Sequence, residues 1–589
     1  ELRYSDALAE FSRARAIFEQ ENDPWEANIA AYFVGYCQVQ NGEGTAGSET
    51  IGKAVDFASR RKFKWLEMTT LYWLAGSKRL LRHQAESVIL FKRALAIAET
   101  IDDKYAIQRN LQDLALESEF LGQRSEALGH CQRMMETAFA AASSERQRAR
   151  NATYAMETFS SFGLFHAARA AATEAIAVAD AQEDPMFRSN SRSFASLTFM
   201  RAGDMEIART FAAQSLDIAG SIKSERSRNK ITALANLRAA AIAERSGDIP
   251  RSTQLFRAAD EALEVEKISY YQYVAKKGLL YGLNSLGETD ELDRRLPTTI
   301  ALIEEYRGNI DSEKERTSFF DNGVTVFDIA VERALNKGDL AAAFNYAERS
   351  TSRELVQRLS SAEGKASSAT LLEPLELGAI RERMDPNVQI VRFTVLEKRL
   401  LIWVISKAKF DVVSVNVDAD VLRKKVEDYV QMVRRGLPGD ASAIATSGQE
   451  LYDIFVSPVS SHLEASLELR LVPTKFLYYL PFAALPDRSG QPLIRSFALG
   501  YSPSASVFAL TSTRAASRAS NDQESLLAIG NPAFSRLDFP DIPYLRSAES
   551  EVTGIAANYA NETVLMNDKA RKDAILKSME RLRQDAREQ

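Results

Sequence analysis

The chain has very few of the residues on which disulfide frameworks, metal sites and covalent catalysis depend. Its 589 residues include 2 cysteines and 4 histidines. The cysteines, Cys37 and Cys131, lie far apart in segments with a helical pattern, so they do not form a disulfide framework and they fit a reducing compartment. Such scattered side chains also lack the local spacing of a zinc site. We therefore expect no metal, no cofactor and a cytoplasmic protein.

Other absences exclude further classes of function. No apolar run reaches the ~18 residues that a membrane-spanning helix needs. The net charge of −6 gives no large positive field for a nucleic-acid backbone. A Gly-x-x-x-x-Gly-Lys phosphate loop and a Gly-x-Ser-x-Gly nucleophile elbow are both missing, and the glycine-rich residues 42–47 form a turn without the lysine. We expect no membrane contact and no direct contact with nucleic acid.

The sequence does contain a repeat. Glycines recur about every 40 residues, and a small residue follows each of them five positions later. The pairs are Gly122 and Ala127, Gly163 and Ala168, Gly203 and Ala208, and Gly247 and Ser252, and Gly42, Gly287 and Gly338 extend the series. This period predicts a solenoid of paired helices, with glycine in each turn because it adopts positive φ without strain. The small residue would let the second helix approach the first.

The pattern within the helices agrees with this prediction. Alanines at 167, 171, 175 and 179 form a stripe after one turn, whereas helices before the turns carry bulkier residues such as Ile231 and Leu237. The repeats resemble the tetratricopeptide family in a longer variant, with most of the consensus Trp and Tyr replaced. The resemblance implies an all-α array over residues 1–292 that binds a protein or peptide partner. A purely supporting role for the array remains the other interpretation.

The period changes in the second half of the chain. A helical connector is expected over residues 293–360, followed by a small-residue linker over residues 361–386. Short β-rich runs at residues 388–395, 399–405 and 410–417 predict a meander, and residues 476–485 also read as a strand. Helices near residues 420–435 and 449–466 come next. Further strands at residues 526–529 and 563–566, and a last helix near residues 570–583, predict an α/β layer.

Short motifs in this α/β region carry a second resemblance. They are Val472-Pro473 with Leu-Pro-Phe-Ala-Ala-Leu at 480–485, Tyr-Ser-Pro-Ser at 501–504, Gly530-Asn531-Pro532, and Leu-Arg-Ser-Ala-Glu-Ser-Glu-Val at 545–552. In this order they resemble the CHAT family, the caspase-like domain found fused to tetratricopeptide repeats. The resemblance covers residues 387–589 and the N-terminal part of that domain. One departure is Thr474-Lys475, where the family more often has Asp-Gly.

The residues of these motifs also have a structural interpretation. Pro473 and Pro481 punctuate strands. Ser547 is expected to cap a helix, and Glu549 and Glu551 suit its positive N-terminus. The buried face of that helix would comprise Ala548, Val552, Ile555, Ala556 and Tyr559.

The CHAT resemblance implies a cysteine endopeptidase with a Cys–His dyad that cleaves a protein substrate. In the family the His lies in a His-Gly motif and the Cys ends a later strand, but no His or Cys follows Met566. We therefore expect a domain incomplete at its C-terminus, catalytic residues beyond Gln589 and an inactive chain, which also begins within a helical pattern. Its half-built sheet would expose apolar residues such as Leu526 and Val564. The alternative is a non-catalytic interaction scaffold with a degenerate caspase-like domain.

The histidines and cysteines that are present do not suggest a replacement dyad. His130 and Cys131 are adjacent, and neighbours on a helix point ~100° apart. They are expected to pack within the array. The same holds for His83, His166 and His462, which are expected to be packing or surface residues. No catalytic, cofactor-binding or metal-binding residue is therefore assigned within the chain.

Overall fold

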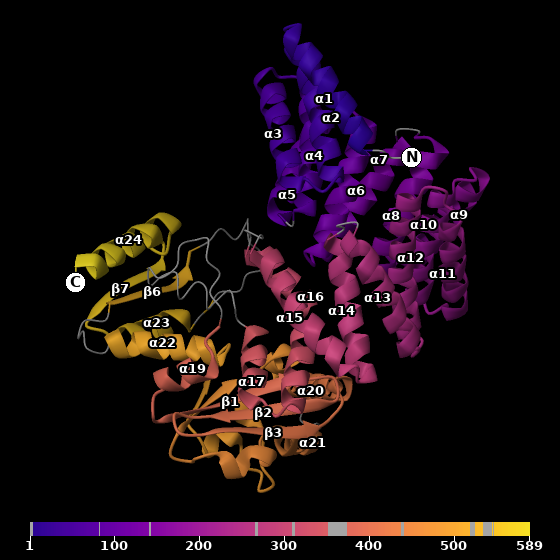
Figure 1. Cartoon of the computed structure of the whole chain (residues 1–589). Coiled ribbons are helices and arrows are strands. Elements are labelled where there is room, and N and C mark those ends of the chain that lie inside the picture. The colour runs from indigo at the N-terminus through magenta and orange to yellow at the C-terminus, as the bar shows by residue number, and fades with distance from the viewer. Residues whose placement is uncertain are drawn as a thin grey trace. The chain divides into compact units, whose positions relative to one another are not determined.

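The structure is a computed structural model of the chain, shown in Figure 1. It describes residues 4–81, 83–140, 143–265, 269–308, 313–351, 374–436, 441–518, 525–533, 545 and 547–588. The chain divides into two compact units. One comprises Glu1–Leu377, Thr394–Leu400 and Asn416–Ala419, and the other comprises Gly378–Phe393, Leu401–Val415 and Asp420–Gln589.

The first unit contains the helical array, and the prediction of a paired-helix solenoid is confirmed. Its helices are α1 (Tyr4–Gln20), α2 (Pro24–Gln40), α3 (Gly44–Arg60), α4 (Lys64–Leu80), α5 (Gln84–Thr100), α6 (Lys104–Phe120), α7 (Arg124–Ala140), α8 (Glu145–Ser161), α9 (Phe165–Ala181), α10 (Pro185–Arg201), α11 (Met205–Gly220), α12 (Glu225–Arg245), α13 (Ile249–Val265), α14 (Ser269–Leu286), α15 (Thr289–Gly308), α16 (Glu313–Asn336) and α17 (Leu340–Arg349). No strand lies among the described residues of this array. Each helix from α1 to α10 has 17 residues, and with short turns this length gives a repeat near 40 residues.

The glycine turns have the predicted backbone conformation. Gly122, Gly163, Gly203 and Gly247 have φ of 73°, 74°, 88° and 78°. The small residues five positions later, Ala127, Ala168, Ala208 and Ser252, are all buried. The predicted stripe on α9 is correct for its last three alanines, whereas Ala167 is exposed and Ala168 takes the buried place. A stripe read at a strict spacing of four misses this shift, because the helix has ~3.6 residues per turn.

The turns between successive pairs also contain a residue with positive φ, which was not predicted from the sequence. Asn22, Lys62, Asp102 and Glu183 adopt φ between 55° and 58°, at nearly the same interval as the glycines. An aspartate often follows, and Asp23, Asp103 and Asp184 accept hydrogen bonds from N–H groups of the next helix. Such caps satisfy helix N–H groups that have no partner within the helix.

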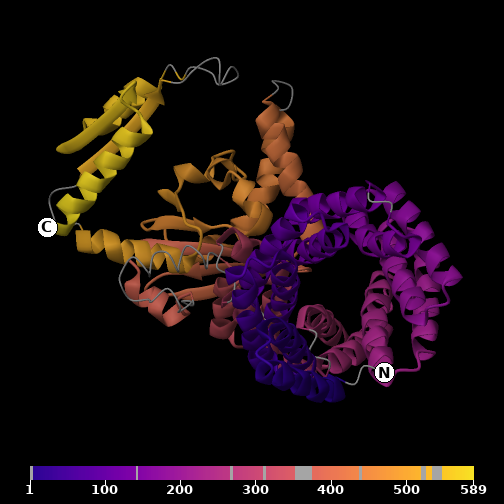
Figure 2. The ribbon, with the colours of Figure 1, turned by 90° about the horizontal axis from the view of Figure 1, so that it is seen from above.

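The helices of the array form a ring, as Figure 2 shows. Contacts between residues that are far apart in the sequence stabilise this curvature. Arg226 Nη2 on α12 donates to the Gln40 carbonyl at the end of α2 at 2.9 Å. The same guanidinium lies 4.9 Å from the ring centroid of Tyr4 on α1. Phe120 on α6 meets Tyr306 on α15 edge to face, with ring centroids 5.2 Å apart. The later helices of the unit therefore pack against earlier ones.

The α/β region comprises α19 (Leu377–Arg383), β1 (Val388–Val395), β2 (Arg399–Ile405), β3 (Phe410–Asn416), α20 (Ala419–Arg435), α21 (Ala441–Phe455), η2 (Ser457–His462), β4 (Glu468–Val472), η3 (Lys475–Tyr479), η4 (Phe482–Ala484), η5 (Leu493–Arg495), β5 (Leu499–Tyr501), α22 (Ala505–Arg518), β6 (Ser525–Pro532), α23 (Ala548–Ala556), β7 (Asn561–Asn567) and α24 (Lys572–Glu588). One sheet has the order β3-β2-β1-β4-β5, and β4 is parallel to both β1 and β5. A second sheet pairs β6 and β7 in parallel. The predicted α/β layer and its meander are confirmed.

The core of the larger sheet is aromatic. β1 is buried along its whole length. Phe393 on β1 stacks on Phe482 at 4.9 Å between ring centroids, and Phe455 meets both rings edge to face. The Leu-Pro-Phe-Ala-Ala-Leu motif therefore supplies a core residue, Phe482, which is fully buried.

Some local predictions are wrong. Residues 476–485 form the 3-10 turns η3 and η4 instead of a strand, because Pro481 offers no N–H and Lys475 has φ of 53°. Ser547 makes no side-chain cap, since its own backbone is already helical. Only Ala556 of the expected face of α23 is buried, and Ile555 is 46% exposed.

Other predictions lie partly outside the described residues. The first part of the expected linker, residues 361–373, falls outside them, and α19 lies within the last part. Leu526 and Leu527 on β6 and Val564 and Leu565 on β7 are half-buried. These two strands are thus covered in part, by α23 and α24.

Candidate functional site

A cavity of about 720 Å³ opens among the helices of the array, near the glycine turns. Its wall comprises Glu119, Phe120, Gly122, Arg124, Ser160, Ser161, Gly163, Phe165, Met200, Arg201, Arg245, Tyr273, Val274 and Lys277. These residues come from the ends of α6, α8, α10 and α12, the starts of α7 and α9, and the body of α14. Ligand pockets in proteins have volumes of ~300–1,000 Å³, so this cavity is large enough for a ligand.

The wall of the cavity is strongly cationic. Arg124, Arg201, Arg245 and Lys277 line it, against a single lining carboxylate, Glu119. The chain as a whole has a net charge of −6, so the local charge has the opposite sign. Arg201 and Arg245 are the last residues of α10 and α12, where a cation also stabilises the negative end of the helix dipole.

Arg201 is held in position by the neighbouring helix α8. Its Nη1 donates to the Glu157 carbonyl at 3.0 Å and to Ser160 Oγ at 3.1 Å. Its Nη2 lies 3.8 Å from Glu157 Oε1. Arg245, by contrast, is exposed and has no ion-pair partner among the described residues. One cation of the cavity is thus preorganised and another is available to a ligand.

Burial shifts the pKa of two groups in the wall. Burial and, to a smaller extent, the neighbouring Glu157 raise the pKa of Glu119 to about 7, against the opposing effects of Arg201, Arg124 and Arg238. Burial also lowers the pKa of Lys277, an effect that Glu244 partly offsets. Near neutral pH, Glu119 therefore changes charge while the arginines do not.

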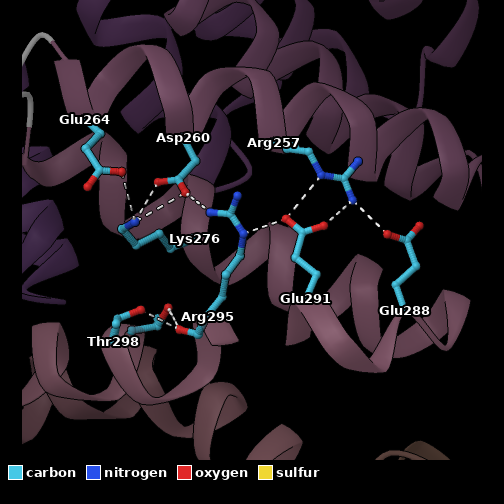
Figure 3. Close-up of polar contacts among 9 residues, drawn as sticks. Arg257, Asp260, Glu264, Lys276, Glu288, Glu291, Arg295 and Thr298 are labelled. Atoms are coloured by element: carbon cyan, nitrogen blue, oxygen red, sulfur yellow. Dashed lines mark hydrogen bonds and ion pairs between the residues drawn. The ribbon is translucent and has the colours of Figure 1, made fainter. Parts of the chain in front are cut away.

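An alternating chain of charges fixes the helix that carries Lys277 (Figure 3). Lys276 Nζ on α14 lies 3.0 Å from Asp260 Oδ1 on α13, and Arg295 Nη1 on α15 lies 2.8 Å from Asp260 Oδ2. Arg295 also pairs with Glu291, at 2.6 Å. Glu291 in turn pairs with Arg257, at 2.9 Å. Asp260 is fully buried, and burial raises its pKa despite both cations. The network links α13, α14 and α15 and so positions one wall of the cavity.

Among the described residues, no hydrogen bond joins a cysteine to a histidine. Cys131 is 2% exposed, and burial raises the pKa of its thiol to about 12. Burial also raises the pKa of the Cys37 thiol and lowers that of His130. His83 pairs with Glu86 at 3.0 Å, and His462 lies 3.4 Å from Asp411. A thiol held in its neutral form is a poor nucleophile.

The Gly-Asn-Pro motif has a structural role in the smaller sheet. Asn531 has φ of 40° and is 5% exposed at the end of β6. Its Nδ2 donates to Glu549 Oε1 on α23 at 2.8 Å. The motif therefore ties the end of the strand to the start of the next helix. A Cβ at Gly530 would lie 2.5 Å from Val552 Cγ2, which accounts for glycine at that position.

The described ranges hold neither a metal site nor a membrane-spanning helix. No group of three or more His, Cys, Asp or Glu side chains there could hold a metal ion. Among the same residues, no helix is long and apolar enough to span a membrane.

The cavity could not be predicted from the sequence, because its residues come from helices that are far apart in the chain. A local signal did exist: Arg201 and Arg245 each stand two residues before a turn glycine, and Arg124 stands two residues after one. Predicting that these positions converge also requires the curvature of the array, which the sequence period does not specify.

Comparison with known proteins gives a family match within the α/β part. A paired-helix array followed by an α/β layer defines a repeat protein with a second, α/β part. Residues 445–587 match the family model described as CHAT domain, so the chain contains a CHAT domain, as its motifs predicted. The search of curated proteins found no match.

The chain is also similar to solved structures, all at low sequence identity. BtubC (BKLC) from P. vanneervenii has 16% identity and a TM-score of 0.33, covering 38% of this chain and 92% of that chain. A Rap protein complexed with competence and sporulation factor has 10% identity and a TM-score of 0.39, and the match covers 58% of this chain and 95% of that chain. A putative kinesin light chain with TPR-like repeats has 14% identity and a TM-score of 0.25, and the match covers 33% of this chain and 93% of that chain. At these scores the likenesses support no argument about a ligand.

Proposed function

We propose that the chain is part of a repeat-regulated, caspase-like cysteine endopeptidase, in which the helical array binds a partner protein or peptide. The observation that carries the proposal is the presence, in one chain, of a CHAT domain and of an array with an open cationic cavity. Partner binding to the array would control cleavage of a protein substrate by the CHAT domain. The protein would work in the cytoplasm, without contact with nucleic acid or membrane.

The catalytic Cys–His dyad is expected outside residues 1–589. A cysteine peptidase needs a thiolate with a base within hydrogen-bond reach. Cys37 and Cys131 are both buried in the array and have raised thiol pKa values. We therefore expect this chain by itself to cleave no peptide.

The second candidate is a non-catalytic scaffold that binds partners through the array. The burial of both thiols favours it for these residues. The two candidates differ in one respect, which is whether the natural protein containing this chain hydrolyses peptide bonds.

A peptide-library digestion with mass-spectrometric readout tests the proposal. The natural protein should give cleavage that iodoacetamide abolishes, whereas the chain of residues 1–589, as the matched control, should give none. No cleavage by the natural protein, with or without a ligand of the array, would favour the scaffold. Thiol-dependent cleavage by residues 1–589 that is lost in Cys131→Ala would show that the dyad has been misplaced.

A further inference from the structure

We propose that the cavity of the array binds an acidic segment of a partner protein, whose carboxylates contact Arg124, Arg201, Arg245 and Lys277. This inference rests on the proposed partner-binding function and assigns its site and its chemistry. The first support is charge complementarity, since the cavity wall has four cations and one carboxylate in an acidic protein.

The arrangement of the cations suits an extended ligand with several carboxylates. Arg124 begins α7, Arg201 ends α10, Arg245 ends α12 and Lys277 lies within α14, so each comes from a different helix. A ligand that contacts all of them must cross the cavity. Arginine side chains also recognise carboxylates with two parallel hydrogen bonds, which a fixed guanidinium such as that of Arg201 can offer at a low entropic cost.

The remainder of the wall favours a peptide over a simple anion. Phe120, Phe165, Met200 and Val274 contribute an apolar surface beside the cations. A peptide can place apolar side chains there and direct its carboxylates to the cations. Nucleic acid offers many phosphates instead, and the net negative charge of the chain opposes its approach.

Glu119 makes the site sensitive to pH. The charged or titratable groups that face it are Arg124 and Cys131 on α7, Glu157 on α8, Arg201 on α10 and Arg238 on α12. Its pKa of about 7 means that the carboxylate loses its charge between about pH 8 and pH 6. Peptide carboxylates stay ionised over this range, because their ordinary pKa values are ~4. An acidic peptide should therefore bind more tightly at the lower pH.

The test measures binding of short fluorescent peptides to the whole chain. One peptide library is rich in Asp, Glu and aromatic residues, and its counterpart has Asn and Gln in place of the acids. We expect the acidic library to bind and the amide library to bind at least about tenfold more weakly, since hydrogen bonds to charged groups are the stronger ones. Arg245→Ala should weaken the acidic library about tenfold, and Arg245→Glu should weaken it further.

Arg60→Ala is the matched control. Arg60 also is an exposed arginine in the last turn of its helix, α3, but does not line the cavity. Its substitution should leave the affinity unchanged, which separates loss of a ligand contact from loss of a helix-dipole contact. Arg245 is exposed, so its variants should fold. Glu119→Gln should bind the acidic peptides about fivefold more tightly near pH 8 and should have lost the pH dependence.

Each contrary result has a distinct meaning. Equal binding of both libraries, or an unchanged affinity in Arg245→Ala, would overturn the acidic-segment assignment and leave partner binding by the array intact. Displacement of the acidic peptides by millimolar inorganic phosphate, which would then be the better ligand, would also overturn it. Failure of both libraries and of an unbiased displayed-peptide library to bind would overturn the partner-binding function itself.

Discussion

Glu117 on α6 shows how a single buried charge affects the array. Its side chain lies 3.6 Å from Arg79 Nη1, which is closer to Asp113 Oδ1, at 2.7 Å. Burial raises the pKa of Glu117 to about 7, and Asp113 adds to this effect. The folded state thus binds the proton more tightly than the unfolded chain does. Stability should therefore fall as the pH rises from 4.5 to about 7.

Glu117→Gln tests this effect at the residue scale. The amide keeps the shape of the side chain and leaves Arg79 paired with Asp113. We expect the variant to be more stable than the original chain by about 1–3 kcal/mol near pH 8 and of similar stability near pH 5. Thermal unfolding at both pH values measures the difference. A variant that is less stable at pH 8 would show that Arg79 requires both carboxylates.

The sequence could not provide this residue-scale information. Glu117 stands in a helical pattern like many exposed glutamates, and its burial results from helices that pack against α6. Ser547 illustrates the opposite error, because its residue type predicted a cap that its helical backbone does not use. Local chemistry predicts such details only where tertiary contacts leave the local conformation unchanged.

At the scale of helices and turns, the glycines give a matched test. Gly163 lies in a turn with φ of 74°, and a Cβ there would meet no atom within 4 Å. Gly129 lies within α7, where a Cβ would also be free of contacts. Gly163→Ala should destabilise the chain by about 1–2 kcal/mol through backbone strain, whereas Gly129→Ala should stabilise it by about 0.5–1 kcal/mol. Chemical unfolding measures the change in the free energy of unfolding for both variants. Changes of the same sign in the two variants would contradict the assignment of the turn.

Element by element, the sequence predicted what repeats or alternates. The bounds of β1 and β2 were predicted from short β-rich runs, and the glycine turns from their period. The turns at Lys62 and Glu183 were not predicted, because residues other than glycine rarely adopt positive φ. The strand predicted at residues 476–485 is absent. The prediction considered only the apolar character of the run and ignored Pro481, which interrupts it.

At the scale of the whole array, Arg226 joins α12 to α1 and α2. Arg226→Ala removes a hydrogen bond and a cation–π contact, so we expect a loss of about 1–2 kcal/mol and a larger radius of gyration in small-angle X-ray scattering. Arg228→Ala is the control, because the guanidinium of Arg228, on the same helix, donates within the described residues to the nearby Ile222 carbonyl alone, at 3.2 Å. An unchanged radius for Arg226→Ala would mean that other contacts hold the ring.

The contact of Arg226 with Gln40 also limits how the array can evolve. Helical arrays usually gain or lose whole units by duplication and deletion, because each unit contacts only its neighbours. Here α12 also meets α1 and α2, through Arg226, Tyr4 and Gln40. Removing one unit between them would turn the two contact surfaces away from each other, and adding one would place a new helix pair where they meet. The copy number of this segment is therefore under a constraint that ordinary open arrays do not have.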